Sequence, residues 1–122
     1  MLSCFKEVNE MKILSHKDVK AKEAEKGASK LKVRWLITKE TGAENFAMRL
    51  FEMKPKGYSP FHNHPWEHEV FILEGEGLIV SEQQERKFRT GDVIFIPPNE
   101  RHQKKSNGEK IGKFLCVVPF HE

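Results

Sequence analysis

Histidines are the residues of this sequence best placed to do chemistry, because three of six fall within a window of seven residues, His62 to His68. A neutral imidazole is a common ligand of divalent metal ions. In an extended strand, residues i and i+2 point to the same side about 6.6 Å apart, so His62 and His64 can aim at one point. Pro65 then bends the chain, which allows His68 to return to that point. The triplet predicts three nitrogens of one metal site.

His102 is the candidate for a fourth ligand. It lies 40 residues after His62, so only a fold that brings separate strands together can use both. His16 and His121 lie near the chain ends without such neighbours, and we expect ordinary histidines there. No Ser–His–Asp arrangement, glycine-rich phosphate loop or Cys-x-x-Cys motif accompanies the cluster. The predicted reactive centre is therefore a metal ion.

Short apolar segments separated by glycine and proline must position these histidines. Residues 32–38 alternate Val33, Trp35 and Ile37 with more polar positions, which is typical of a strand. Pro55, Gly57 and Pro60 are predicted to end the second segment. The strands we predict are 32–38, 45–54, 69–73, 78–81, 86–90, 93–96 and 111–118, with at most a helical turn near 17–28. Such spacing predicts an all-β sandwich or small barrel.

Length and composition favour one folded domain. The chain has 122 residues, nine Phe and two Trp, and contains no apolar run of the roughly 18 residues that a membrane helix needs. Residues 1–30 are predicted to be an N-terminal extension with a charged segment, and 31–122 the barrel. The start lacks the apolar stretch of an export signal, so we expect a cytoplasmic protein whose cysteines, Cys4 and Cys116, stay reduced.

The positive charge is confined to one segment. The net charge is +3, and residues 17–32 hold six Lys against three acids. This segment has no Arg and no aromatic residue to stack on bases, so we predict a solvated segment and no nucleic-acid or membrane partner.

Three further residues are candidates for the pocket. Arg49 can anchor a carboxylate or form a surface salt bridge. Phe114 and Cys116 share one strand face, but Leu115 and Val117 make the other face equally apolar. The pattern does not choose which face is inside.

The histidine-rich segment resembles the first motif of the cupins. That motif has a glycine, two histidines one residue apart, a glutamate four or five residues later and a closing glycine. Here residues 57–69 read GYSPFHNHPWEHE, followed by Gly75 and Gly77, which we interpret as turn residues. The resemblance implies a conical jelly-roll barrel of six to eight strands with one metal in its mouth.

A second segment resembles the second cupin motif, in which glycine, proline, glycine and histidine recur. Gly91, Pro97 and His102 match it, whereas Asn99 stands in place of the usual second glycine. Asparagine tolerates the left-handed backbone for which glycine is used. The two motifs together cover about half of the chain.

The important departure from the family is at His68 and Glu69, since the family's glutamate spacing reaches either residue. Adjacent strand residues point to opposite faces, so only one can be a ligand, and parity alone does not choose. The run HNHPWEHEVFILEGEG resembles small cupins in which four histidines bind manganese, which implies His68 as the ligand. Glu69 then lies outside or hydrogen-bonds a ligand imidazole.

Four imidazoles leave the metal its full +2 charge, so the site is expected to attract anions. An octahedral arrangement leaves two positions for dioxygen, peroxide or a chelating substrate, whereas a closed tetrahedral zinc site is structural. Imidazole chemistry alone ranks copper, zinc, nickel and iron above manganese, while the resemblance implies manganese. We predict an oxidoreductase or oxygenase acting on a small organic substrate. A metal-dependent binding or sensor module and a metal-dependent isomerase are the alternatives.

Two expectations concern packing. Trp66 lies between the second and third predicted ligands and either holds the bend by packing or forms a wall of the pocket. A barrel of this size has sheet edges to cover, and many cupins do so with a second copy, so we predict a homodimer.

Overall fold

The computed structural model describes residues 10–107, 109 and 111–120. Cys4 and His121, which were considered above, lie outside the described residues. No helix among the described residues has the length and apolar character needed to cross a membrane.

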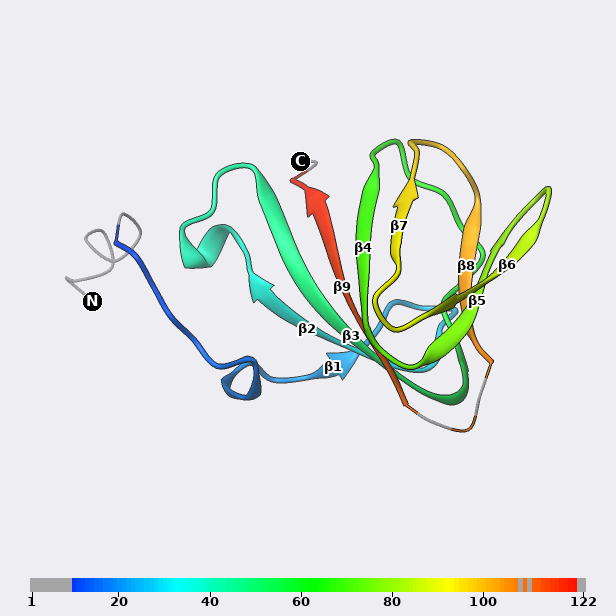
Figure 1. Ribbon diagram of the computed structural model, residues 1–122. Helices are drawn as coiled ribbons and strands as arrows, with labels where there is room; N and C mark the ends of the chain where they lie inside the picture. The colour runs from blue at the N-terminus through cyan, green and yellow to red at the C-terminus, as the bar shows by residue number, and fades with distance from the viewer. Residues whose placement is uncertain (1–9, 108, 110, 121–122) are drawn as a thin grey trace.

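The fold is a single curled, nine-stranded antiparallel sheet (Figure 1). Its hydrogen-bonded order is β6-β5-β8-β3-β9-β4-β7, with β2 on β3 and β1 on β2. The strands are β1 Lys22–Glu23, β2 Ser29–Ile37, β3 Phe46–Tyr58, β4 His68–Glu74, β5 Glu76–Ser81, β6 Glu85–Arg89, β7 Val93–Ile96, β8 His102–Ser106 and β9 Gly112–Pro119. Two short 3-10 helices, η1 His16–Asp18 and η2 Lys39–Thr41, complete the described structure. The all-β prediction is confirmed.

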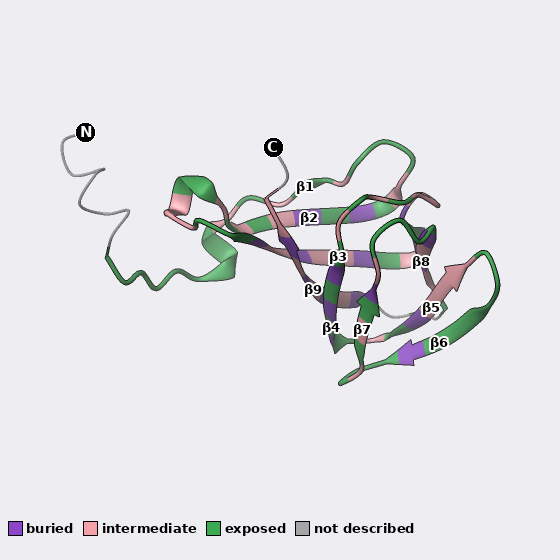
Figure 2. Ribbon diagram, turned by 90° about the horizontal axis from the view of Figure 1, so that it is seen from above, coloured by how far each residue is buried: buried purple, intermediate pink, exposed green. Residues whose placement is uncertain are grey.

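The inner face of the curled sheet carries the core. Along β9, buried and half-buried residues alternate (Figure 2), as the two-residue period of a strand requires. Phe114 and Cys116 face inward with 2% and 1% of their surface exposed. The question left open by the sequence is thereby settled, and Leu115 and Val117 lie on the opposite face.

Two strand predictions are corrected. Pro55 and Gly57 do not end the second segment, because β3 continues to Tyr58. Its end passes close to β2, where a Cβ on Gly57 would lie 2.7 Å from the Lys30 carbonyl oxygen. The glycine therefore permits a close backbone approach at a register shift. In addition, the polar segment β8 is a strand that the apolar pattern did not predict.

The motif residues that need a left-handed backbone have one. Asn99 has φ 71° and Gly75 has φ 101°, which agrees with the turn positions predicted for them. Gly77 is different, because it lies within β5, where a Cβ would meet the Phe88 ring at 2.4 Å. Its small size is needed for packing.

The segment before the barrel is attached to it. β1 pairs with β2, Ala24 and Ala28 pack against the core, and Leu31 is 2% exposed. The lysines between residues 17 and 32 are exposed, as expected of a solvated segment. The boundary between residues 30 and 31 stays a prediction.

Candidate metal centre

A backbone bridge joins the two histidine motifs. The His62 N–H donates to the His102 carbonyl at 3.1 Å, and the His102 N–H donates to the His62 carbonyl at 2.8 Å. This reciprocal pair is the hydrogen-bonded pairing of an antiparallel ladder, although His62 itself lies in no strand. It brings together two residues that are 40 positions apart in the sequence.

Further hydrogen bonds hold the two segments on either side of this bridge. The Asn99 N–H donates to the His64 carbonyl at 2.6 Å. On the other side, the Ser59 N–H donates to the Lys104 carbonyl at 2.9 Å, and the Lys104 N–H donates to Ser59 Oγ at 2.9 Å. The loop before β4 is thus fixed against the loop and strand that carry His102, without regular strand geometry of its own.

The four predicted ligands come together. Ring centroids of His62 and His64 are 4.5 Å apart, and those of His62 and His102 are 4.9 Å apart. His68, the first residue of β4, has its ring centroid 5.0 Å from that of His102 and 5.3 Å from that of His64. All four line one cavity. Their role as metal ligands stays a prediction.

The deeper imidazoles are neutral, and each has one ring nitrogen that is buried without a hydrogen bond. Burial, with a further effect of Lys104, lowers the pKa of His68 to about 2 and that of His102 to about 4. His102 Nδ1 contacts the Glu100 carbonyl at 2.9 Å, so it carries the proton and leaves Nε2 as a free lone pair. His102 Nε2 and His68 Nδ1 are buried without a hydrogen bond. Buried polar atoms normally have a partner, and a divalent cation fits this donor set.

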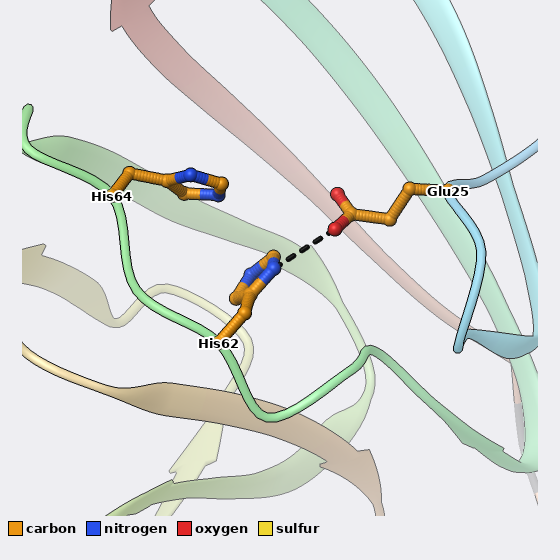
Figure 3. A group of neighbouring side chains, drawn as sticks. All are labelled: Glu25, His62 and His64. Carbon is orange, nitrogen blue, oxygen red and sulfur yellow. Dashed lines mark ion pairs between the residues drawn. The ribbon is translucent and has the colours of Figure 1, made fainter.

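A carboxylate, that of Glu25, lies at the mouth of the cavity. Glu25 belongs to the segment between β1 and β2. Its carboxylate accepts from His62 Nδ1 at 2.8 Å (Figure 3). This hydrogen bond lowers the pKa of Glu25, although partial burial opposes the shift. Candidate ligand atoms of Glu25, His62 and His64 all lie within 4.8 Å of one another. Glu25 is therefore placed either to orient His62 or to contact the ion.

The inner end of the cavity is lined by cations and apolar groups. Arg49, Lys104, Phe114 and Cys116 share the cavity with the histidines. Arg49 Nη2 donates to Cys116 Sγ at 3.1 Å, and Lys104 Nζ lies 5.4 Å from the Phe114 ring centroid. Burial lowers the pKa of Lys104. Of the two alternatives for Arg49, this position favours a role in the pocket.

Trp66 and Glu69 lie in contrasting positions. Trp66 stacks on the His64 ring, with centroids 4.5 Å apart and planes 8° apart, and it also packs against the core. Glu69 is exposed and lies in an outer groove formed by β4, β7 and β9. Of the two neighbours His68 and Glu69, only His68 shares the cavity.

Sequence reasoning missed Glu25 and Lys104. Lys104 follows His102 by two residues on β8 and therefore lies on the same face of the strand. Had residues 102–106 been predicted as a strand, this spacing would have indicated Lys104. Glu25 carried no such signal, because it lies in a charged segment that the sequence predicts to be solvated. It reaches the mouth through the pairing of β1 with β2 and the packing of Ala24 on the core.

The comparison with known families identifies the class of protein. Residues 49–118 match the family model of the cupin domain. This match covers more than half of the chain, so the protein belongs to the cupin family, and the predicted cupin jelly roll is confirmed.

Known relatives differ in activity. The polyketide cyclase RemF from Streptomyces resistomycificus has a similar structure, with a TM-score of 0.86 and 36% identity, over 90% of this chain and 80% of that chain. The oxalate-binding protein of Thermotoga maritima is 32% identical over 75% of this chain and 78% of its own length. For two other curated relatives, the match with this chain covers less than half of the relative's own length, 45% and 46%. The latter is the 1-methylthio-D-xylulose 5-phosphate methylsulfurylase of Rhodospirillum rubrum, 31% identical over 58% of this chain.

Single alanine substitutions of His62, His64, His68 and His102 are expected to weaken metal binding more than about 100-fold, since partners outside the ligand shell alone contribute about 10–100-fold. Metal analysis of protein purified without chelator, followed by titration with Mn²⁺, measures the loss. His16→Ala and Glu69→Ala are the matched controls and should retain the metal. Full metal content in His68→Ala, together with loss in Glu69→Ala, contradicts the assignment.

Trp66→Ala is expected to lower both stability and metal affinity, because it removes the stacking partner of His64. Trp66 is only half-buried, so the cost in unfolding free energy should fall below the roughly 3–5 kcal/mol of a fully buried Trp, at about 1–3 kcal/mol. Urea denaturation of the metal-free protein measures it, and Trp66→Phe should recover most of the loss. An unchanged stability and metal affinity, with weaker substrate binding, would instead make Trp66 a wall of the pocket.

Proposed function

We propose that this cupin is a mononuclear metal-dependent enzyme acting on a small, oxygen-chelating organic anion, with manganese as the metal. His62, His64, His68 and His102 are the proposed ligands. The buried and unpartnered ring nitrogens of His68 and His102 are the observation that carries the proposal. Iron, nickel, zinc and copper also suit imidazole, and the resemblance to manganese cupins favours manganese among them.

The chain's own residues would hold and orient the reacting groups. The contact of His102 Nδ1 with the Glu100 carbonyl fixes which nitrogen faces the cavity. Trp66 and Glu25 hold the rings of His64 and His62. Phe51 and Phe114, stacked 5.2 Å apart between centroids, supply an apolar wall that excludes water.

A bound divalent metal supplies Lewis acidity and, for manganese or iron, redox chemistry. Among the residues that the structure describes, the cavity lining contains no aspartate, so no Ser–His–Asp triad forms there, which agrees with a reaction centred on the metal. We therefore propose oxidation or oxygenation with dioxygen or a peroxide in the cytoplasm.

A second candidate is metal-assisted cyclisation or isomerisation without oxidant. The identity of 36% with a polyketide cyclase over 90% of the chain favours it. Polyketides carry enolisable carbonyl groups, and an electrophilic cation can stabilise the enolate oxygen that forms when the α-carbon loses a proton. A non-catalytic binding module is the remaining alternative.

Turnover of a substrate panel distinguishes these functions. Metal-free protein loaded with Mn²⁺ or Fe²⁺ is expected to consume dioxygen or peroxide with small diols, phenols, oxo acids or short polyketides. His102→Ala should abolish the reaction, and His16→Ala should leave it unchanged. Turnover that persists without dioxygen and peroxide, detected as cyclised or isomerised product by NMR, would support the second candidate and overturn oxidation. Binding of a chelating anion without any turnover would leave the binding module.

We also propose that a second copy covers the outer face of β4, β7 and β9. Phe71, Val93 and Phe95 are 43%, 74% and 60% exposed there, and they lie around an apolar groove with Leu115 and Val117. β7 is also an end of the strand order, so this face adjoins a free sheet edge. A two-fold arrangement would place the patch of one copy on the same patch of the other.

Light scattering at micromolar concentration is expected to give the mass of a dimer. A charge in the patch, as in Phe95→Glu, should yield monomers that retain their metal, because the cavity lies on the opposite face of the sheet. Lys87→Glu on β6 is the control with a charge change away from the patch. A monomeric mass for the unchanged protein would overturn the proposal.

A further inference from the structure

The inner end of the cavity contains two basic side chains that the proposed metal site does not account for. Lys104 is 6% exposed, and Arg49 Nε is buried without a hydrogen bond. Charged groups that are removed from water are nearly always paired, because burying an unpaired charge is costly. Both residues line the cavity that the four histidines share.

Neighbouring aromatic and sulfur groups hold these two cations without neutralising them. The guanidinium carbon of Arg49 lies 5.2 Å from the Trp35 ring centroid and 5.0 Å from that of Phe51. Its Nη2 contacts Cys116 at 3.1 Å, while Lys104 Nζ lies 5.4 Å from the centroid of Phe114. Aromatic faces attract cations but carry no net charge. Since Phe114 and Cys116 are neighbours on one face of β9, the two cations flank the same short stretch of wall.

The lining holds no carboxylate free to pair with them. Among the residues that line the cavity, Glu25 is the only acid. It lies at the mouth, its side chain is 50% exposed, and it is bound to His62 at 2.8 Å. A divalent metal bound by neutral histidines would add further positive charge. The electrostatics of the cavity therefore favour an anion that comes from outside the chain.

We propose that Arg49 and Lys104 form a subsite that binds the carboxylate group of the substrate beside the metal. This inference deepens the proposed function and rests on it, because it names the charged end of the molecule that the metal centre would act on. A guanidinium fork matches the two oxygens of a carboxylate, and an ammonium group adds a point charge. The free volume of the cavity is only about 30 Å³, so it admits a small group better than a bulky one. A compact planar carboxylate suits it better than a tetrahedral phosphate.

The position of Glu25 affects how a substrate would reach this subsite. Its carboxylate occupies the mouth through which a substrate must enter, and it is attached through β1, which pairs with β2 at only two positions. A substrate longer than a single carboxylate would have to displace this side chain from His62. The incoming molecule and the Glu25 side chain would then compete for the space at the mouth beside His62.

Malonate binding, measured by calorimetry on the metal-free protein and again with Mn²⁺ bound, tests the subsite separately from turnover. Lys104→Met and Arg49→Met preserve much of the side-chain volume and are expected to weaken binding about ten-fold or more in both forms. Lys105→Met, the neighbouring position on β8, and Arg86→Met on β6 should change it less than about two-fold. Mn²⁺ stoichiometry and circular dichroism establish that each variant retains its site and fold.

A second measurement applies even if one variant is poorly folded. Malonate should raise the melting temperature of the unchanged metal-free protein more than inorganic phosphate does at equal ionic strength. Equal malonate affinity in the folded Lys104 and Arg49 variants overturns the subsite, as does the absence of any malonate effect on the unchanged protein. A stronger effect of phosphate overturns the assignment to a carboxylate.

The two proposals fail in different ways. Charge-dependent malonate binding without turnover of any substrate keeps the subsite and rejects the enzyme. Turnover by the metal-loaded protein, with malonate binding unaffected by Lys104→Met and Arg49→Met, keeps the enzyme and rejects the subsite.

Discussion

The reciprocal pair of backbone hydrogen bonds between His62 and His102 is the contact on which the whole site depends. Neither residue is close to the other in sequence, and His62 belongs to no strand. Backbone hydrogen bonds fix the positions of the Cα atoms, and stacking then restricts the rings, as Trp66 does for His64. Because the pair uses main-chain groups only, both imidazoles stay available for the cavity. The fold thus separates the groups that hold the loop from the groups that can do chemistry.

Strand parity then distributes the remaining side chains. β4 begins at His68 and is buried at every second residue, so Glu69 lies on the outer face while Val70 and Ile72 join the core. The same alternation on β8 places His102 and Lys104 together, and on β9 it places Phe114 and Cys116 together. Three strands of the curled sheet therefore contribute to one cavity by the same two-residue period. A shift of register by one residue would turn the cavity-lining side chains to the outer face and bring the residues of the outer apolar groove inside.

The sequence predicted those parts of the molecule that depend on local patterns. The all-β class and most strands follow from alternation and turn residues, and the clustering of His62, His64 and His68 follows from their spacing. The left-handed Asn99 was expected from its place in the motif that resembles the cupins. The strand β8 was missed because HQKKS carries no apolar alternation. Lys104 on this strand points into the cavity, and the cavity exists only because strands that are distant in the sequence meet in the fold. For the same reason, the sequence did not choose between the two equally apolar faces of β9.

The family match and the rest of the chain contribute different parts of the cavity. Residues 49–118 match the cupin model and include all four histidines, both inner cations and the wall residues Phe114 and Cys116. Glu25 and Leu31, which line the same cavity, precede that match. The mouth is thus built by a segment attached through β1 and through the packing of Ala24 and Ala28 on the core. The basic residues at the inner end lie on the paired strands β3 and β8, whereas the acid at the mouth lies on a short loop, so the inner end is the more rigid of the two. Differences in substrate length between relatives with such a lining would then arise at the mouth, because the chain before residue 31 supplies none of the four proposed histidine ligands.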